Sequence, residues 1–272
     1  MAAERDAAYG LRFSGIEDAR RLLQHGLDDW PVISVACRRV ESVPAVAAAD
    51  ERAGVAWLGE GRRIMTDRQG ASATFLTTRP LVFEDMVHPG LGHVAVHFGR
   101  WLGREVLHAG ALVASGVAWA VGGDSMSGKS SLLAALAAAG YPVISDDSLV
   151  VEQGAVYAGP RCIDLRIDPD RPPLGSSLER SRAGSRERLI LSAVDTPIRL
   201  AGLLHLSWGQ ELAVTRLAPA ERLRRLLSLR LPVDHLGTGA LDLAALPAWV
   251  IERPRRWDAL EATREQVERL VS

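Results

Sequence analysis

Eight consecutive residues carry the strongest chemical signal in the sequence. They match the pattern Gly-x-x-x-x-Gly-Lys-Ser/Thr at every fixed position: Gly123, Asp124, Ser125, Met126, Ser127, Gly128, Lys129 and Ser130. Glycines let such a loop wrap closely, so that successive backbone N–H groups point at phosphate oxygens. An apolar run at 117–121 precedes the motif and a helix-forming run at 132–136 follows it, which is the context that a phosphate-binding loop requires. The motif therefore predicts binding of a nucleoside triphosphate.

The lysine and the serines of this motif have defined roles in such loops. Lys129 is expected to reach the β- and γ-phosphates and the Ser130 hydroxyl to coordinate Mg²⁺, with Ser131 beside them in the nucleotide site. Lys129 is also the only lysine among 32 basic residues. A compact ammonium fits between phosphate oxygens where a broad guanidinium does not, so a lysine at this position agrees with a phosphate contact. We therefore expect ATP and Mg²⁺ as cofactors.

A pair of aspartates follows the motif, after one helix and a short apolar strand at 143–145. Phosphoryl transfer needs one carboxylate to orient and deprotonate the attacking oxygen and another to help hold Mg²⁺. Asp146 and Asp147 supply two. Because adjacent residues that leave a strand point to opposite sides, we expect the two to do different jobs. The alternative, an Asp-Asp turn that only ends the strand, stays open.

The order of these features resembles the HPr kinase/phosphorylase family. The shared elements are the loop motif, a helix that ends at Gly140, the segment Ser145-Asp146-Asp147, and an earlier strand with a histidine, Leu107-His108-Ala109-Gly110-Ala111-Leu112-Val113. The sequence looks closer still to the shorter HPr-kinase-like proteins found beside peptide-modifying enzymes. The resemblance spans residues 88–167. It implies an α/β fold with a P-loop kinase core of the HPr kinase and phosphoenolpyruvate carboxykinase type.

The resemblance also implies roles for individual residues. Asp147 corresponds to the catalytic base, and Asp146 lies on the metal side with Ser130. Lys129 takes part in catalysis as well as in nucleotide binding. His108 corresponds to a histidine that orients the base or contacts the γ-phosphate, and a structural histidine in a half-buried strand is the alternative.

Two features of the family are missing from this sequence. The later acidic segment that supplies a metal-ligating glutamate is not recognisable, and Asp164 or Arg166 is the candidate to replace that ligand. The glycine–arginine–asparagine element near the C-terminus of HPr kinases is also absent. The resemblance therefore does not extend to phosphorylase activity, to HPr as a substrate or to a hexameric assembly.

The patterning of the chain indicates a β-rich N-terminal portion at 1–86 and a P-loop kinase core at 87–272. Alternating and continuous apolar runs predict strands at 32–37, 55–58, 63–66, 74–77, 105–113, 117–122, 143–145, 149–151, 155–157, 202–207, 212–217 and 249–252. Helical spacing predicts helices at 16–26, 88–103, from the loop motif to 139, at 219–229 and from 257 onward.

Two further groups of residues could bind a ligand. Residues 168–186 read as a long loop, and the arginines in and after it could receive an acidic peptide or nucleotide phosphates: Arg171, Arg180, Arg182, Arg186 and Arg188. A solvated loop is the alternative. His93 and His97, with His88 nearby, have a spacing that can bind a metal, but no convincing third ligand accompanies them and a plain helix face is the preferred interpretation.

Composition narrows the class of protein. The net charge is −1 and no block of like charges occurs, so we expect no nucleic-acid partner. Two distant cysteines, no signal-peptide pattern and no apolar run of about 20 residues favour a cytoplasmic protein without a membrane span.

Together these observations predict a kinase that transfers the γ-phosphate of ATP to a hydroxyl. The resemblance implies that the hydroxyl belongs to a serine of a peptide or small protein, such as a ribosomally made peptide precursor. A small-molecule hydroxyl kinase and a non-catalytic nucleotide-dependent binding module are the alternatives. The oligomeric state is left open.

Overall fold

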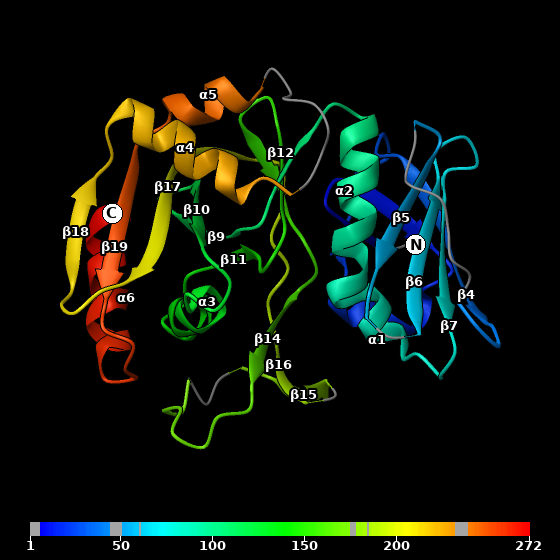
Figure 1. The fold of residues 1–272 in the computed structure, drawn as a ribbon, viewed down its shortest axis with the longest axis horizontal. Coiled ribbons are helices and arrows are strands. Elements are labelled where there is room, and N and C mark those ends of the chain that lie inside the picture. The colour runs from blue at the N-terminus through cyan, green and yellow to red at the C-terminus, as the bar shows by residue number, and fades with distance from the viewer. Residues whose placement is uncertain (1–5, 44–50, 60, 175–177, 184, 232–238) are drawn as a thin grey trace.

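The computed structural model describes residues 6–43, 51–59, 61–174, 178–183, 185–231 and 239–272. Over these residues the protein is mixed α/β, with β-sheets of seven, nine and three strands. Figure 1 shows the seven-stranded sheet on the right, the nine-stranded sheet on the left and the three-stranded sheet below. In this described part of the chain, no helix combines the length and the apolar character needed to cross a bilayer.

The N-terminal sheet has the strand order β3-β1-β2-β4-β7-β6-β5. Its side chains alternate as expected for a half-covered sheet: along β4, Ile33 and Val35 are buried while Val32 is exposed. The four strands predicted between 32 and 77 are confirmed as β4 to β7. The strands are β1 (Asp6–Ala8), β2 (Leu11–Ser14), β3 (Gln24–His25), β4 (Val32–Arg39), β5 (Ala53–Trp57), β6 (Arg62–Asp67) and β7 (Ser72–Thr77).

The helix predicted at 16–26 is wrong. The chain forms only a 3₁₀ turn, η1 (Glu17–Leu22), before strand β3 pairs with β1. The pairing of Asp6 with His25 and of Ala7 with Gln24 uses backbone groups that a longer helix would have bonded internally. Tertiary pairing has therefore overridden the local helical pattern.

A helical segment covers the N-terminal sheet. It consists of α1 (Phe83–Asp85), the π-helical turn η2 (Met86–Gly90) and α2 (Leu91–Trp101). The predicted helix begins later than expected because His88 precedes a proline and has extended backbone angles, with φ −135° and ψ 122°.

The apolar side chains of α2 join the N-terminal core. Leu91, Val94 and Phe98 are buried in the same cluster as Phe75 of β7. This helix lies C-terminal to residue 86, yet it packs with the N-terminal sheet. The predicted division of the chain at 86/87 stays a prediction.

The nine-stranded sheet positions the loop motif. Its main order is β11-β9-β10-β17-β13-β12-β8, with β19 beside β17 and β18 beside β19. Strand β17 runs parallel to both β10 and β19, and the other pairings are antiparallel. Strands of this sheet are β8 (Glu105–Leu107), β9 (Gly110–Ala114), β10 (Val117–Gly123), β11 (Val143–Ser145), β12 (Leu149–Glu152), β13 (Ala155–Tyr157), β17 (Ile198–Trp208), β18 (Ala213–Arg216) and β19 (Ala248–Arg253).

Helices cover both faces of this sheet. On one face α3 (Lys129–Ala138) and α6 (Ala259–Val271) pack against residues such as Val121. On the other face α4 (Pro219–Leu229) and α5 (Gly239–Ala245) pack against residues such as Ala120. The neighbours Ala120 and Val121 thus belong to different cores, because side chains alternate along a strand. The predicted helices at 219–229 and after 257 are confirmed.

Two predictions in this half of the chain are wrong. The single strand expected at 105–113 is broken into β8, which pairs with β12, and β9, which pairs with β10 and β11. His108 and Ala109 lie between them. The loop expected at 168–186 contains a strand, because β14 (Cys162–Arg166), β15 (Arg180–Ala183) and β16 (Arg186–Ile190) form the small third sheet. Positions 175–177 and 184 of that segment lie outside the described residues.

Candidate functional site

The loop motif lies where three parallel strands end. Strand β10 ends at Gly123, β17 ends at Trp208 and β19 ends at Arg253, and the pairing registers bring these ends to one edge of the sheet. In sheets with parallel strands, ligands bind at the carboxyl edge. The 123–130 loop leaves this edge and enters α3, as the sequence predicted.

Glycine is required at the two fixed glycine positions of the loop. Gly123 has φ +141°, and a side chain there would lie 2.5 Å from the carbonyl oxygen of Leu206 on β17. Gly128 has φ +87° at the N-terminal cap of α3, and a Cβ atom there would lie 2.0 Å from Nη2 of Arg253. The glycines therefore allow the loop to pack closely and leave backbone N–H groups at the start of a helix, where an anion is favoured.

Lys129 is buried at the first position of α3, with 5% of its surface exposed. Its ammonium donates hydrogen bonds to the carbonyl oxygens of Gly123 at 2.9 Å and Asp124 at 3.2 Å, and lies 3.2 Å from Nε2 of His108. Burial lowers the pKa of Lys129, and the nearby carboxylates Asp147, Asp146 and Asp124 act in the opposite direction.

The neighbours of His108 determine which nitrogen carries its proton. Nε2 faces the Lys129 ammonium, which can only donate, and Nδ1 lies 3.1 Å from the backbone oxygen of Asp147, which can only accept. These contacts fit the tautomer with the proton on Nδ1, which donates to Asp147 while Nε2 accepts from Lys129. It bridges the loop lysine and the Asp147 turn, so the strand break at His108 places this ring between two predicted site residues.

Asp146 and Asp147 follow strand β11 and differ in environment. Asp147 has φ +72°, a left-handed turn that ends the strand, and its side chain lines the cavity described below. Asp146 is 3% exposed and accepts a hydrogen bond from the Ser130 hydroxyl. Burial, with a contribution from the Asp147 charge, raises the pKa of Asp146 to about 8, while the bond from Ser130 lowers it.

Ser130 and Asp146 together have the donor set of a magnesium site. The Ser130 Oγ and Asp146 Oδ1 atoms are 3.0 Å apart. Oxygens in adjacent positions of an octahedron about 2.1 Å from Mg²⁺ lie about 3.0 Å apart, so this pair fits two neighbouring positions.

A cavity of about 480 Å³ opens beside the loop. This is within the usual range for small-molecule sites. Among the described residues, its charged lining has an excess of cations over the three carboxylates Asp147, Asp164 and Asp168. The cations are Lys129 and six arginines: Arg166, Arg171, Arg186, Arg253, Arg255 and Arg256. Such a lining favours a polyanionic ligand.

The arginines predicted as a ligand-binding group separate in the structure. Arg171 and Arg186 line the cavity, and Arg171 also pairs with Glu187. Arg180 pairs with Glu187 at 2.8 Å. The side chain of Arg182 lies outside the described residues, and Arg188 is buried in the ion pair described next.

Asp164, one of the two candidates to replace the metal-ligating glutamate, has both carboxylate oxygens hydrogen-bonded to an arginine, and its role as a metal ligand stays a prediction. Arg188 donates to both carboxylate oxygens of Asp164, at 2.7 and 2.8 Å, and to the His88 carbonyl oxygen at 2.9 Å. Asp164 and Arg188 also face each other across β14 and β16. Burial acts to lower the pKa of Arg188, but its hydrogen bonds to Asp164 and the negative groups around it, Asp164 included, together outweigh burial and raise the pKa. Arg166, the other candidate, is an exposed residue of the cavity lining.

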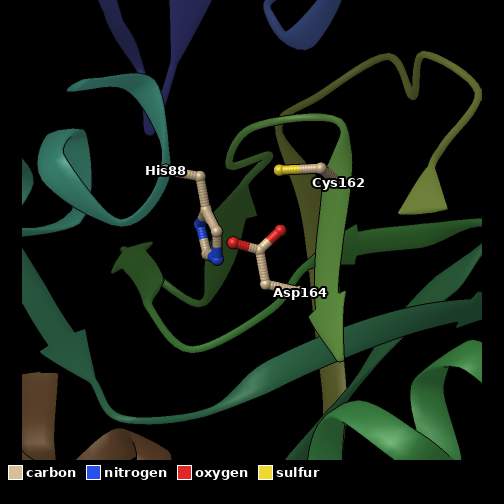
Figure 2. A group of neighbouring side chains, drawn as sticks. All are labelled: His88, Cys162 and Asp164. Atoms are coloured by element: carbon tan, nitrogen blue, oxygen red, sulfur yellow. The ribbon is translucent and has the colours of Figure 1, made fainter. Parts of the chain in front are cut away.

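His88 and Cys162 lie close to Asp164, and all three are buried (Figure 2). Their ligand atoms lie within 4.8 Å of one another. Burial lowers the pKa of His88 and raises that of the Cys162 thiol, so neither gains from ionisation here. With the Arg188 guanidinium on both oxygens of Asp164, the group is a buried ion pair rather than a cation site.

His93 and His97 lie on α2, and the interpretation of the two as a plain helix face stays a prediction. His97 contacts the Thr66 hydroxyl of β6 through Nδ1 at 2.9 Å.

Sequence reasoning missed the residues that β17 and β19 contribute to the cavity. Trp208 and Arg253 end these two strands, and Arg255, Arg256 and Trp257 follow. These residues follow from the direction of the strands, which the sequence did not indicate. Strands β17 and β19 are aligned in parallel with β10, so the residues at their carboxyl ends lie beside the loop.

No family model matches the chain, and no curated protein matches its sequence. Among solved structures, the HPr(Ser) kinase/phosphatase from Coxiella burnetii is similar to 61% of this chain and 97% of its own length, with 15% identity and a TM-score of 0.27. A TM-score this low carries no argument about fold or activity. The functional interpretation therefore rests on the geometry of the site.

Proposed function

We propose that the protein is a nucleoside-triphosphate-dependent phosphotransferase that transfers a γ-phosphoryl group to a hydroxyl. One observation carries the proposal: Lys129, Ser130 and Asp147 line one cationic cavity, and the buried Asp146 accepts a hydrogen bond from Ser130. These groups are the ones that hold a nucleotide and Mg²⁺ and accept a proton in phosphoryl transfer.

The loop and its lysine bind the phosphates in this proposal. The backbone N–H groups of 123–130 and the start of α3 face the anion, and the Lys129 ammonium exchanges its carbonyl contacts for phosphate oxygens. Ser130 and Asp146 would hold Mg²⁺, which neutralises charge on the β- and γ-phosphates when bound. Asp146 must lose its proton to take that role, because burial and the Asp147 charge raise its pKa.

Asp147 accepts the proton of the attacking hydroxyl. Asp147 lines the cavity, whereas Asp146 is buried against Ser130, so the two residues differ in environment. His108 positions this turn through its bond to the Asp147 carbonyl oxygen. Proton transfer to a positioned carboxylate contributes about 10²- to 10⁴-fold to such reactions.

The acceptor is proposed to be a serine of a peptide or small protein, in a cytoplasmic setting. This part rests on the resemblance of the loop, His108 strand and Asp-Asp segment to HPr-kinase-like sequences. The cationic rim formed by Arg166, Arg186 and Arg255 suits an acceptor with acidic groups near its hydroxyl.

One observation favours a second candidate, a non-catalytic nucleotide-dependent binding module. Both oxygens of Asp164 accept hydrogen bonds from Arg188, which makes Asp164 a poor substitute for the later metal ligand of HPr-kinase-like sequences. A module of this kind would bind nucleotide without transferring phosphate.

A labelling experiment separates these possibilities. The purified protein is incubated with Mg²⁺, ATP labelled on the γ-phosphate and a host extract split into peptide and small-molecule fractions. Asp147→Asn, which keeps the side-chain shape, is the control and is expected to lose about 100-fold or more of the turnover. We expect acid-stable label on a peptide serine with the wild type only. Label in the small-molecule fraction would instead identify a metabolite kinase, and ATP binding without any transfer would identify the binding module.

A further inference from the structure

Arg253 is a buried arginine in the wall of the candidate nucleotide cavity. It is the last residue of β19 and is 3% exposed. Its guanidinium lies over the Trp208 ring, 4.4 Å from the ring centroid, and Nη2 donates to the Ser127 carbonyl oxygen at 3.3 Å. Its Nε is buried and has no hydrogen-bond partner among the described residues. The side chain thus has a fixed position with donor capacity unused.

The contrast with Arg188 shows what Arg253 lacks. Both are buried, but Arg188 has the Asp164 carboxylate on two of its nitrogens. Within the described ranges no carboxylate pairs with Arg253. Burial accordingly lowers the pKa of Arg253 to about 10, which still leaves it charged at neutral pH. A buried charge without a counterion is unfavourable, so its presence indicates that an anion completes the site.

The position of Arg253 identifies where that anion lies. Its guanidinium packs against the loop itself, so closely that a Cβ atom on Gly128 would come within 2.0 Å of Nη2. The exposed Arg255 and Arg256 lie farther along the chain on the same cavity. An anion held by the loop backbone is therefore within reach of Arg253.

We infer that Arg253 binds a phosphate group of the nucleotide held by the 123–130 loop and is a nucleotide-binding residue of the site. The inference rests on the proposed nucleotide function. It also adds a second reason, besides the positive φ angle, why position 128 must be glycine: a side chain there would displace the Arg253 guanidinium. The part of the nucleotide that Arg253 would contact is its polyphosphate chain. Free tripolyphosphate has the same chain without a nucleoside, so it probes this contact alone.

The test is the variant Arg253→Met, which keeps a long apolar side chain against Trp208 and removes the charge. Arg224→Met is the matched control, because Arg224 is an exposed residue of α4 with 78% of its side chain accessible. Each protein is titrated calorimetrically with Mg²⁺-ATP and with tripolyphosphate, and its melting temperature is measured without ligand. Arg253→Lys serves as the conservative variant.

We expect Arg253→Met to bind both ligands about 30-fold more weakly or worse, with an unchanged or higher melting temperature, because an uncompensated charge has been removed. Arg253→Lys should regain part of the affinity, and Arg224→Met should bind like the wild type. Unchanged affinity in Arg253→Met would overturn the inference, as would a lower melting temperature without ligand, since that result indicates a structural arginine.

Failure of the proposed function has a different signature. If the wild type and Arg224→Met bind neither ATP nor tripolyphosphate, the nucleotide site itself is wrong and the role of Arg253 falls with it. If Lys129→Ala weakens binding and Arg253→Met does not, the nucleotide site stands and only the inference about Arg253 is refuted.

Discussion

Replacing Gly128 by alanine is expected to have two effects on the loop, and comparison with a second glycine variant separates them. The first is backbone strain, because Gly128 has φ +87° and an L-residue in the left-handed region costs about 1–2 kcal/mol. The second is a collision, because the new Cβ would lie 2.0 Å from Arg253 Nη2. Ordinary contact needs about 3.5 Å, so the guanidinium must move by about 1.5 Å.

Gly140 provides a matched control at the other end of the same helix. It has φ +96°, and a Cβ atom there would meet nothing within 4 Å. Gly140→Ala therefore introduces the strain without the collision. Both variants should lose about 1–2 kcal/mol of stability, which corresponds to a fall of roughly 2–8 °C in melting temperature.

Only Gly128→Ala is expected to lose nucleotide affinity. Displacing the guanidinium should cost about as much as removing it, so Mg²⁺-ATP should bind to Gly128→Ala about 30-fold more weakly than to Gly140→Ala. Isothermal titration of the two variants measures this ratio. Affinities within about threefold of each other would refute the argument that Gly128 makes room for an arginine used in binding.

Three further predictions concern the charges around the site. Burial and the Asp147 charge raise the pKa of Asp146 to about 8. Protonation of Asp146 therefore increases the free energy of unfolding; this stabilisation is complete below about pH 4 and is lost as the pH rises toward 8. The melting temperature of the metal-free protein should therefore fall between pH 5 and 8, and Asp146→Asn should flatten that slope; an unchanged slope would count against the buried carboxyl. Arg188→Met leaves the Asp164 charge buried and should cost about 3–5 kcal/mol in urea unfolding. The double variant Arg188→Met/Asp164→Leu should recover most of that loss, and additive losses would contradict the pairing.

The parts of the site that follow from local sequence could be predicted. The loop motif combines residue types with only a few uses at that spacing, and its flanking strand and helix have strong local patterns. The structure places β10 before the loop and α3 after it. The Asp146-Asp147 pair could likewise be expected near the loop, because one helix and one short strand separate them.

The parts that depend on strand pairing could not be predicted. The apolar run at 105–113 gave no sign of the break at His108, since a buried segment need not alternate. Strand β15 consists of arginine, serine and alanine and lacks an apolar pattern, so it was expected to be loop. The partner of Asp164 is 24 residues away, and only the register of β14 with β16 brings the two together.

Binding of Mg²⁺-ATP to the purified protein tests the central claim most directly. Lys129→Ala removes the ammonium beside His108 and the loop carbonyl oxygens, and Arg224→Ala removes one exposed positive charge elsewhere. Isothermal titration should give saturable binding by the wild type and by Arg224→Ala, and at least tenfold weaker binding by Lys129→Ala. Absence of saturable binding by the wild type, or equal affinity for all three proteins, would contradict the account of the 123–130 loop as a nucleotide site.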